Sequence, residues 1–417
     1  MTSQEILLNS LNHKAGKVPV DFGATSITGI HCSIVAGLRK YYGLEDRPVR
    51  LIEPYQMLGD IDEELIEAMG VDVIPMARFS TMFGFDLENF KEWKSPWGQL
   101  LLVPEKFNVR ESDEGYLMFP KGDSSCEACA CMPKKGFFFD ARNRQGEIDE
   151  DNLKLEDNLE EFTDISESDL AHWKADADKV RASNHKMGTI AHMPTTALGD
   201  IAFVPAMNLD KPKGVRNVAD WYMLLASDEG FVAKLFDAQC EIAIQNLAKI
   251  HAAVGGALDV AAICGTDFGT QNGTFCSLEK FMKLWHPRYK KINDWIHENT
   301  TWKTFKHSCG AVEGFMNAFI ESGFDIINPV QCSAAGMEPQ KLKDKYGDRI
   351  TFWGAGIDTQ KVLPYGTPEE VRAQVLKRLE IFSKNGGFVF NAIHNIQAKT
   401  PIENVAAMIE AVKEFNS

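Results

Sequence analysis

The sequence predicts an α/β protein folded as a (β/α)8 TIM barrel, with an inserted segment that decorates the C-terminal face of the barrel. Two observations lead to this prediction. At least five strand–loop–helix units follow one another in the C-terminal half, and their strands are almost continuously apolar. Such strands belong to a parallel sheet that is covered on both faces. Eight units closed into a barrel fit this pattern best, and a doubly wound open sheet is the alternative.

The predicted elements begin with two strands, at residues 17–23 (KVPVDFG) and 71–77 (VDVIPMA). Apolar side chains then recur at helical spacing over residues 229–252, and a strand follows at 258–264 (LDVAAIC). The remaining predicted elements are strands at 302–307, 324–330, 349–354 and 386–392, and helices at 311–322, 368–383 and 401–415.

The region from about residue 82 to 178 interrupts the alternation, and we interpret it as an insertion in a single barrel domain that spans residues 1–417. Within it, residues 133–143 (PKKGFFFDARN) are typical of a hairpin strand. The acidic run at 147–162 (EIDEDNLKLEDNLEEF) is typical of a solvated helix and a linker.

Three cysteines of this region form a C-x2-C-x-C cluster, Cys126, Cys129 and Cys131. No partner cluster follows at zinc-ribbon spacing, so we interpret them as small residues that precede the hairpin.

The composition restricts the class of partner. A formal net charge of −15 argues against nucleic acid or an anionic membrane, because both bind basic surfaces. The sequence shows no signal peptide and no apolar run long enough to span a membrane. The nine cysteines are scattered and odd in number, which favours reduced thiols. We therefore expect a cytoplasmic protein that acts on a small-molecule substrate.

Polar residues follow nearly every predicted strand, at the end where the active sites of such barrels lie. We expect three of them, Asp267, Gln331 and Asp358, to orient the substrate or move a proton. Four others are predicted to contact the substrate: Asp21, Gln271, Asn328 and Gln397.

The most specific motif is His307-Ser308-Cys309. Side chains two apart on an extended segment point the same way, so this pair can bind one zinc ion. A catalytic zinc site needs a third protein ligand and an open position, and His394 is the best-placed third ligand. The alternative is a hydrogen-bonded barrel histidine beside a buried thiol.

Six segments resemble the uroporphyrinogen decarboxylase superfamily, which implies the barrel fold. They are PVDFGATSITGIH (19–31), DFGTQNG (267–273), HSCGAVEGF (307–315), DIINPVQCSAAGM (325–337), GIDTQKVLPYGTPEEV (356–371) and NAIHNIQAKTPIENV (391–405). True uroporphyrinogen decarboxylases are cofactor-free and hold the substrate's carboxylates with an arginine-rich N-terminal segment. This chain has no arginine before Arg39, which disfavours that activity.

The chain is more similar to the cobalamin-dependent methyltransferase branch, the methylcobalamin:coenzyme M type, which binds zinc through a His-x-Cys pair and a later Cys. The resemblance implies that His307 and Cys309 bind zinc, with His394 at the position of the later Cys. Zinc held by two His and one thiolate carries a charge of about +1, which favours polarising an oxygen or nitrogen that bears a methyl group.

We therefore predict a zinc-dependent methyltransferase. It moves a methyl group between a small O- or N-methylated (or thiol) substrate and cobalamin carried by a partner corrinoid protein. One alternative is a metal-free decarboxylase of a tetrapyrrole or smaller carboxylic acid, anchored by Asp21 or Asp267. Another is a non-catalytic barrel that binds a corrinoid or metabolite.

Overall fold

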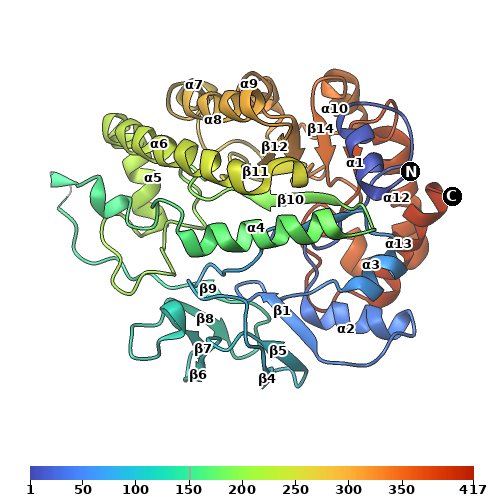
Figure 1. The fold of residues 1–417 in the computed structure, drawn as a ribbon, viewed down its shortest axis with the longest axis horizontal. Coiled ribbons are helices and arrows are strands. Elements are labelled where there is room, and N and C mark those ends of the chain that lie inside the picture. The colour runs from blue at the N-terminus through green and yellow to red at the C-terminus, as the bar shows by residue number, and fades with distance from the viewer. Residues whose placement is uncertain (150–151) are drawn as a thin grey trace.

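The computed structural model describes residues 1–149 and 152–417, and within them a sheet of seven parallel strands forms most of a barrel (Figure 1). Neighbouring strands follow the order β15-β14-β13-β12-β11-β10-β3. Their bounds are β3 Val73–Pro75, β10 Gly188–His192, β11 Val260–Cys264, β12 Lys303–His307, β13 Ile326–Asn328, β14 Thr351–Trp353 and β15 Phe388–Val389.

The segment around Val20 closes the barrel between the two edges of this sheet. Val20 forms a parallel bridge with Phe390, which directly follows β15. On its other side, the carbonyl oxygen of Val20 accepts a hydrogen bond from the backbone N–H of Asp72, next to β3 (2.8 Å). The predicted (β/α)8 barrel is therefore confirmed, and the open-sheet alternative is wrong.

Apolar side chains fill the barrel, as is usual for this fold. They are contributed by all seven strands and include Val73, Ile190, Val260, Phe305, Ile326, Trp353 and Val389. Leu7 and Leu11 of helix α1 pack against the same cluster. Strand β10 was not among the predicted strands, because its sequence GTIAH offers only a very short apolar run.

Helices cover the outer face of the sheet. The helices predicted at 229–252, 311–322, 368–383 and 401–415 are confirmed, although 311–322 divides into a 3-10 turn (Glu313–Phe315) and α9. The capping box of Thr367 and Glu370 fixes the start of α12. The helices are α1 Ser3–Leu11, α2 Cys32–Tyr41, α3 Glu63–Met69, α4 Glu167–Ala182, α5 Val218–Ser227, α6 Glu229–Val254, α7 Leu278–Leu284, α8 His286–Asn299, α9 Met316–Glu321, α10 Pro339–Tyr346, α11 Val362–Tyr365, α12 Pro368–Phe382 and α13 Ile402–Phe415.

Two small sheets lie together on one side of the barrel (Figure 1). The first has the order β2-β1-β5-β4, with β1 Val49–Glu53, β2 Leu58–Gly59, β4 Lys91–Lys94 and β5 Leu100–Val103. The second has the order β6-β7-β8-β9, with β6 Val109–Glu111, β7 Gly115–Met118, β8 Ala130–Pro133 and β9 Asp140–Ala141. The predicted hairpin strand thus corresponds to β8 and β9, which pair antiparallel.

The added sheets reach the C-terminal face of the barrel through Phe137. Its carbonyl oxygen lies 3.0 Å from His31 Nε2, and Lys399 Nζ lies 4.6 Å from its ring centre. His31 follows the first barrel segment and Lys399 follows β15. The insertion bounds of 82 and 178 remain a prediction. Strands β1 and β2 precede residue 82 but belong to one of the added sheets. Helix α4 extends past residue 178 and packs on α6.

The prediction of a solvated helix over the acidic run 147–162 is wrong for its described residues; residues 150 and 151 lie outside them. The described residues of the run include a 3-10 turn at Glu156–Asn158 and no α-helix. The buried guanidinium of Arg216 accounts for the difference, because it binds Glu161 (2.6 Å) and the Asp157 carbonyl (2.9 Å) and so draws the run onto the protein.

Candidate active site

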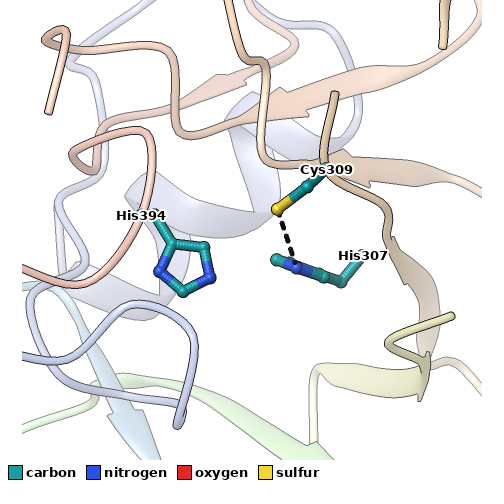
Figure 2. Close-up of side chains that lie close together, drawn as sticks. All are labelled: His307, Cys309 and His394. Carbon is teal, nitrogen blue, oxygen red and sulfur yellow. Dashed lines mark hydrogen bonds between the residues drawn. The ribbon is translucent and has the colours of Figure 1, made fainter. Parts of the chain in front are cut away.

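The predicted zinc ligands His307, Cys309 and His394 come together at the C-terminal mouth of the barrel (Figure 2). His307 ends β12, Cys309 follows two residues later, and His394 lies in the loop after β15. One ligand atom from each residue lies within 4.8 Å of the others. Within residues 1–149 and 152–417 this is the only such group of three, so the cysteines of the insertion do not form another.

A hydrogen bond fixes the orientation of the His307 ring. His307 Nδ1 lies 2.6 Å from Asn328 Oδ1, and the amide nitrogen of Asn328 donates to the Trp353 carbonyl oxygen (3.0 Å). The second bond turns the amide so that its oxygen faces His307, and that oxygen can only accept. His307 therefore carries its proton on Nδ1, which leaves the lone pair of Nε2 free, 3.4 Å from Cys309 Sγ.

The loop that carries Cys309 is held from two sides. Asp267 Oδ1 accepts the Cys309 N–H (2.7 Å), and Gln331 Oε1 accepts the Gly310 N–H (2.9 Å). Gly310 has φ +88°, and a Cβ there would lie 2.4 Å from the carbonyl carbon of Gly269. The two loops can approach this closely only because both positions are glycine.

Burial controls the protonation of the three candidate ligands. It lowers the pKa of His307 to about 3 and that of His394 to about 4, so both imidazoles are neutral near pH 7. Burial, followed by the Asp267 charge, raises the pKa of the Cys309 thiol. A bound cation would oppose the effects of burial and of the Asp267 charge on Cys309, and so would favour its thiolate.

Two cavities adjoin this group. One, of about 170 Å³, is lined by Cys309, Gln331, Ser333, Asp358, Thr359, Gln360, Ile393 and His394. The other, of about 150 Å³, is lined by Asp267 together with mainly apolar and aromatic side chains such as Phe268, Phe275 and Trp285. The first is the more polar, and it contains two of the three candidate zinc ligands.

The remaining predicted residues differ in how close they lie to this centre. Asp358 lines the polar cavity, while its Oδ1 accepts the N–H groups of Gln360 (2.7 Å) and Lys361 (3.0 Å). Gln271 accepts a hydrogen bond from Gln331 (3.0 Å) and so lies at the rim. Gln397 is exposed, and its carbonyl oxygen accepts the Thr400 hydroxyl (2.8 Å).

Two predicted substrate contacts lie beneath the surface of the mouth. Asn328 is fully buried and its amide is used by His307 and Trp353, so the structure favours a role in orienting His307. Asp21 is also fully buried, and its oxygens accept from the Ala24 N–H (3.0 Å) and the Trp353 indole (2.9 Å). Burial raises the pKa of Asp21 to about 6.

Three polar residues near this centre were not predicted from the sequence: Arg78, His192 and Lys306. Arg78 directly follows the predicted strand 71–77 and could have been found there, whereas His192 ends the strand that was not predicted. Lys306 is fully buried, and its ammonium group donates to the carbonyl oxygens of Thr266 (2.6 Å) and His307. It thereby ties together the ends of β11 and β12.

The fold and the mouth residues define a TIM-barrel protein with a candidate His/Cys metal centre. The family described as Uroporphyrinogen decarboxylase (URO-D) matches residues 203–415, about half of the chain, and the chain belongs to this family. Within residues 1–149 and 152–417 none of the helices combines the length and apolar character that a membrane span needs.

Two relatives and one solved structure illustrate this membership. The chain is 32% identical over 102 residues to uroporphyrinogen decarboxylase of Methylococcus capsulatus, covering 24% of this chain and 27% of the relative. It is 34% identical over 89 residues to the Coxiella burnetii enzyme, covering 20% and 24%. These alignments thus span about a quarter of each relative. A methyltransferase from Methanosarcina mazei superposes with a TM-score of 0.56 at 15% identity, covering 100% of both chains, which shows a shared fold.

Proposed function

We propose that the protein is a zinc-dependent methyltransferase that moves a methyl group between a small O- or N-methylated (or thiol) substrate and cobalamin carried by a partner corrinoid protein. The convergence of His307, Cys309 and His394 beside a polar cavity carries this proposal. The likeness in fold to a methyltransferase over the whole chain agrees with it.

The donor set suits zinc. Bond lengths of about 2.0–2.3 Å in a tetrahedral site place ligand atoms roughly 3.3–3.8 Å apart. The separation of 3.4 Å between His307 Nε2 and Cys309 Sγ falls in this range. Both imidazoles are neutral, and Asn328 presents the lone pair of His307 to the centre. When bound, zinc would supply Lewis-acid polarisation of the atom that bears the methyl group.

Other residues of the chain would position the reacting groups. Asp267 and Gln331 hold the backbone of Cys309 and Gly310, which sets the direction of the thiol. Asp358 lines the same cavity as Cys309 and His394, and we expect it to orient the substrate or carry the proton exchanged with the demethylated atom. Gln271 extends this rim through its bond with Gln331.

A second candidate function is the metal-free decarboxylation of a carboxylic acid, because the matched curated relatives are uroporphyrinogen decarboxylases. Asp21 is a poor anchor for such a substrate, since it is fully buried and both of its oxygens are bonded within the protein. Release of carbon dioxide from a carboxylic acid in the presence of a chelator would favour this function over methyl transfer.

Metal analysis of the purified protein tests the main proposal. We expect about 1 zinc per chain, and loss of most of it in His307→Ala and in Cys309→Ser. Cys126→Ser is the matched control, because this half-buried cysteine lies in the insertion and should leave the zinc content unchanged. A wild-type content below about 0.1 zinc per chain, unaltered in the two variants, would refute the proposal.

A further inference from the structure

A second group of polar side chains lies at the mouth of the barrel, where the adjacent strands β3 and β10 end. Arg78 follows β3 and His192 is the last residue of β10, and the two strands pair in parallel. Parallel strands bring their C-terminal ends to the same edge, so both side chains lie on the face that carries His307 and His394. The mechanism proposed above uses neither of them.

The guanidinium group of Arg78 is largely unpaired. Its single hydrogen bond within residues 1–149 and 152–417 runs from Nη2 to the Gly23 carbonyl oxygen (2.5 Å). No described carboxylate forms an ion pair with it within 4.0 Å. None of its nitrogens is among the buried polar atoms that lack a partner, so the unpaired N–H groups reach solvent. An arginine carries five donors in a planar fork, and most of this fork is free.

Three carboxylates act on Arg78 through their charge, with Asp60 first and Asp21 and Glu53 after it, and the last two direct their oxygens elsewhere. Asp21 accepts from Ala24 and the Trp353 indole, and Glu53 accepts the N–H groups of Tyr55 (3.1 Å) and Gln56 (2.7 Å). These carboxylates offset the guanidinium charge at longer range without occupying its donors. The N–H groups of Arg78 that reach solvent are therefore available to an anionic acceptor, in competition with the Asp60 carboxylate.

His192 adds a neutral side chain to the corner. Its side chain is solvent-exposed at the end of β10. Desolvation and the nearby Arg78 charge lower the pKa of His192 to about 4, which keeps the ring uncharged at neutral pH. A single cation among several acids suits a monoanion such as a carboxylate better than a phosphate of higher charge.

A short chain of contacts links this corner to the candidate zinc centre. His192 Nε2 lies 3.5 Å from Ser26 Oγ. The Ser26 carbonyl oxygen accepts a hydrogen bond from the amide nitrogen of Asn395 (2.7 Å), the residue that follows His394. These contacts connect His192 to the loop that carries His394.

We propose that Arg78, with His192 beside it, binds a carboxylate group of the substrate and thereby selects small methylated carboxylic acids over neutral methylated compounds. The guanidinium fork would receive the carboxylate in two hydrogen bonds, while the methyl-bearing end of the molecule lies at the candidate zinc centre. This assignment of substrate class rests on the proposed methyltransferase function.

The test measures the dissociation constants of methoxyacetate and of its neutral analogue methoxyacetamide, by calorimetric titration of the zinc-loaded full chain. The variants are Arg78→Gln, Arg78→Lys and, as a matched control, Arg372→Gln on the outer helix α12, where Arg372 pairs with Glu414. We expect the wild type to bind the acid at least about tenfold more tightly than the amide. Arg78→Gln should abolish that preference by weakening only the acid, and Arg372→Gln should keep it.

Equal binding of acid and amide by the wild type, or a preference that survives in Arg78→Gln, would overturn the proposal. If Arg78→Gln fails to fold, the result for Arg78→Lys decides. This variant keeps the positive charge but loses the planar donor fork, so its preference for the acid should be reduced. An undiminished preference for the acid would overturn the proposed two hydrogen bonds from Arg78. The zinc content of the same samples separates the two proposals. A carboxylate preference that depends on Arg78 in a protein without zinc would refute the proposed zinc-dependent function while leaving the carboxylate site supported.

Discussion

Replacing Asn328 by leucine removes the group that orients His307 and leaves the three candidate ligands in place. Asn328 is fully buried, and its amide bonds to His307 Nδ1 (2.6 Å) and the Trp353 carbonyl oxygen (3.0 Å). Asn328→Leu leaves one buried donor and one buried acceptor without partners, at about 1–3 kcal/mol each, so the free energy of unfolding of the zinc-free protein should fall by about 2–6 kcal/mol. Loss of such an outer partner of a metal-binding histidine weakens zinc binding by roughly 10–100-fold.

Competition with a chromogenic chelator measures the zinc affinity, and urea denaturation measures the stability. Asn293→Leu is the matched control, since Asn293 is fully buried but donates to the Ser322 carbonyl oxygen (2.8 Å) between helices, away from the mouth. It should lose stability and keep its zinc affinity. If Asn328→Leu bound zinc within about threefold of the Asn293→Leu control, the argument that Asn328 sets the proton position of His307 would be refuted.

Two further predictions concern the glycine contact and the buried acid. Gly310→Ala should reduce the zinc content and lower the urea midpoint, because its Cβ would lie 2.4 Å from Gly269 and its φ is +88°. Gly314→Ala, which has nothing within 4 Å, is the control, and equal behaviour of the two variants would contradict the prediction. Burial raises the pKa of Asp21 from 3.8 to about 6, so its proton is held more tightly in the folded state than in the unfolded state. Its contribution to stability is therefore fully present below about pH 4 and lost as the pH rises through about 6, by about 3 kcal/mol in total. Asp21→Asn should remove this change, so the difference in unfolding free energy between variant and wild type should shift in favour of the variant between pH 4 and 7.5; a constant difference would contradict it.

The barrel was predictable from the sequence because its strands are buried on both sides. Runs such as 258–264 and 324–330 are apolar without alternation, and long amphipathic stretches such as 229–252 lie between them. Strand β10 escaped because GTIAH contains so short an apolar run, and its place depends on pairing with β3 and β11. The acidic run 147–162 was misjudged because the effect of Arg216, more than 50 residues away, is not visible locally.

The candidate zinc ligands were predictable for a different reason. The pair His307 and Cys309 is local, and the position of His394 after the last strand follows from the rule that barrel strands end on one face. The orienting role of Asn328 could not be derived in this way, because it depends on the adjacent strand register that sets His307 opposite Asn328. The same limit applies to Arg78, whose unpaired donors are a property of the assembled mouth.

The cations at the mouth also bear on the choice between methyl transfer and decarboxylation of a tetrapyrrole. A substrate with eight carboxylates needs several free cationic groups to hold it. Lys306 is buried and bonded to backbone carbonyls, and Lys280, beside the apolar cavity, pairs with Glu229 at 3.2 Å. Arg78 keeps most of its donors unpaired and open to solvent, and Lys399 lies over the Phe137 ring (4.6 Å). Two such cations are too few for eight carboxylates, so the mouth suits a smaller substrate, and a polar cavity of about 170 Å³ beside Cys309 and His394 is a suitable size for its methylated end.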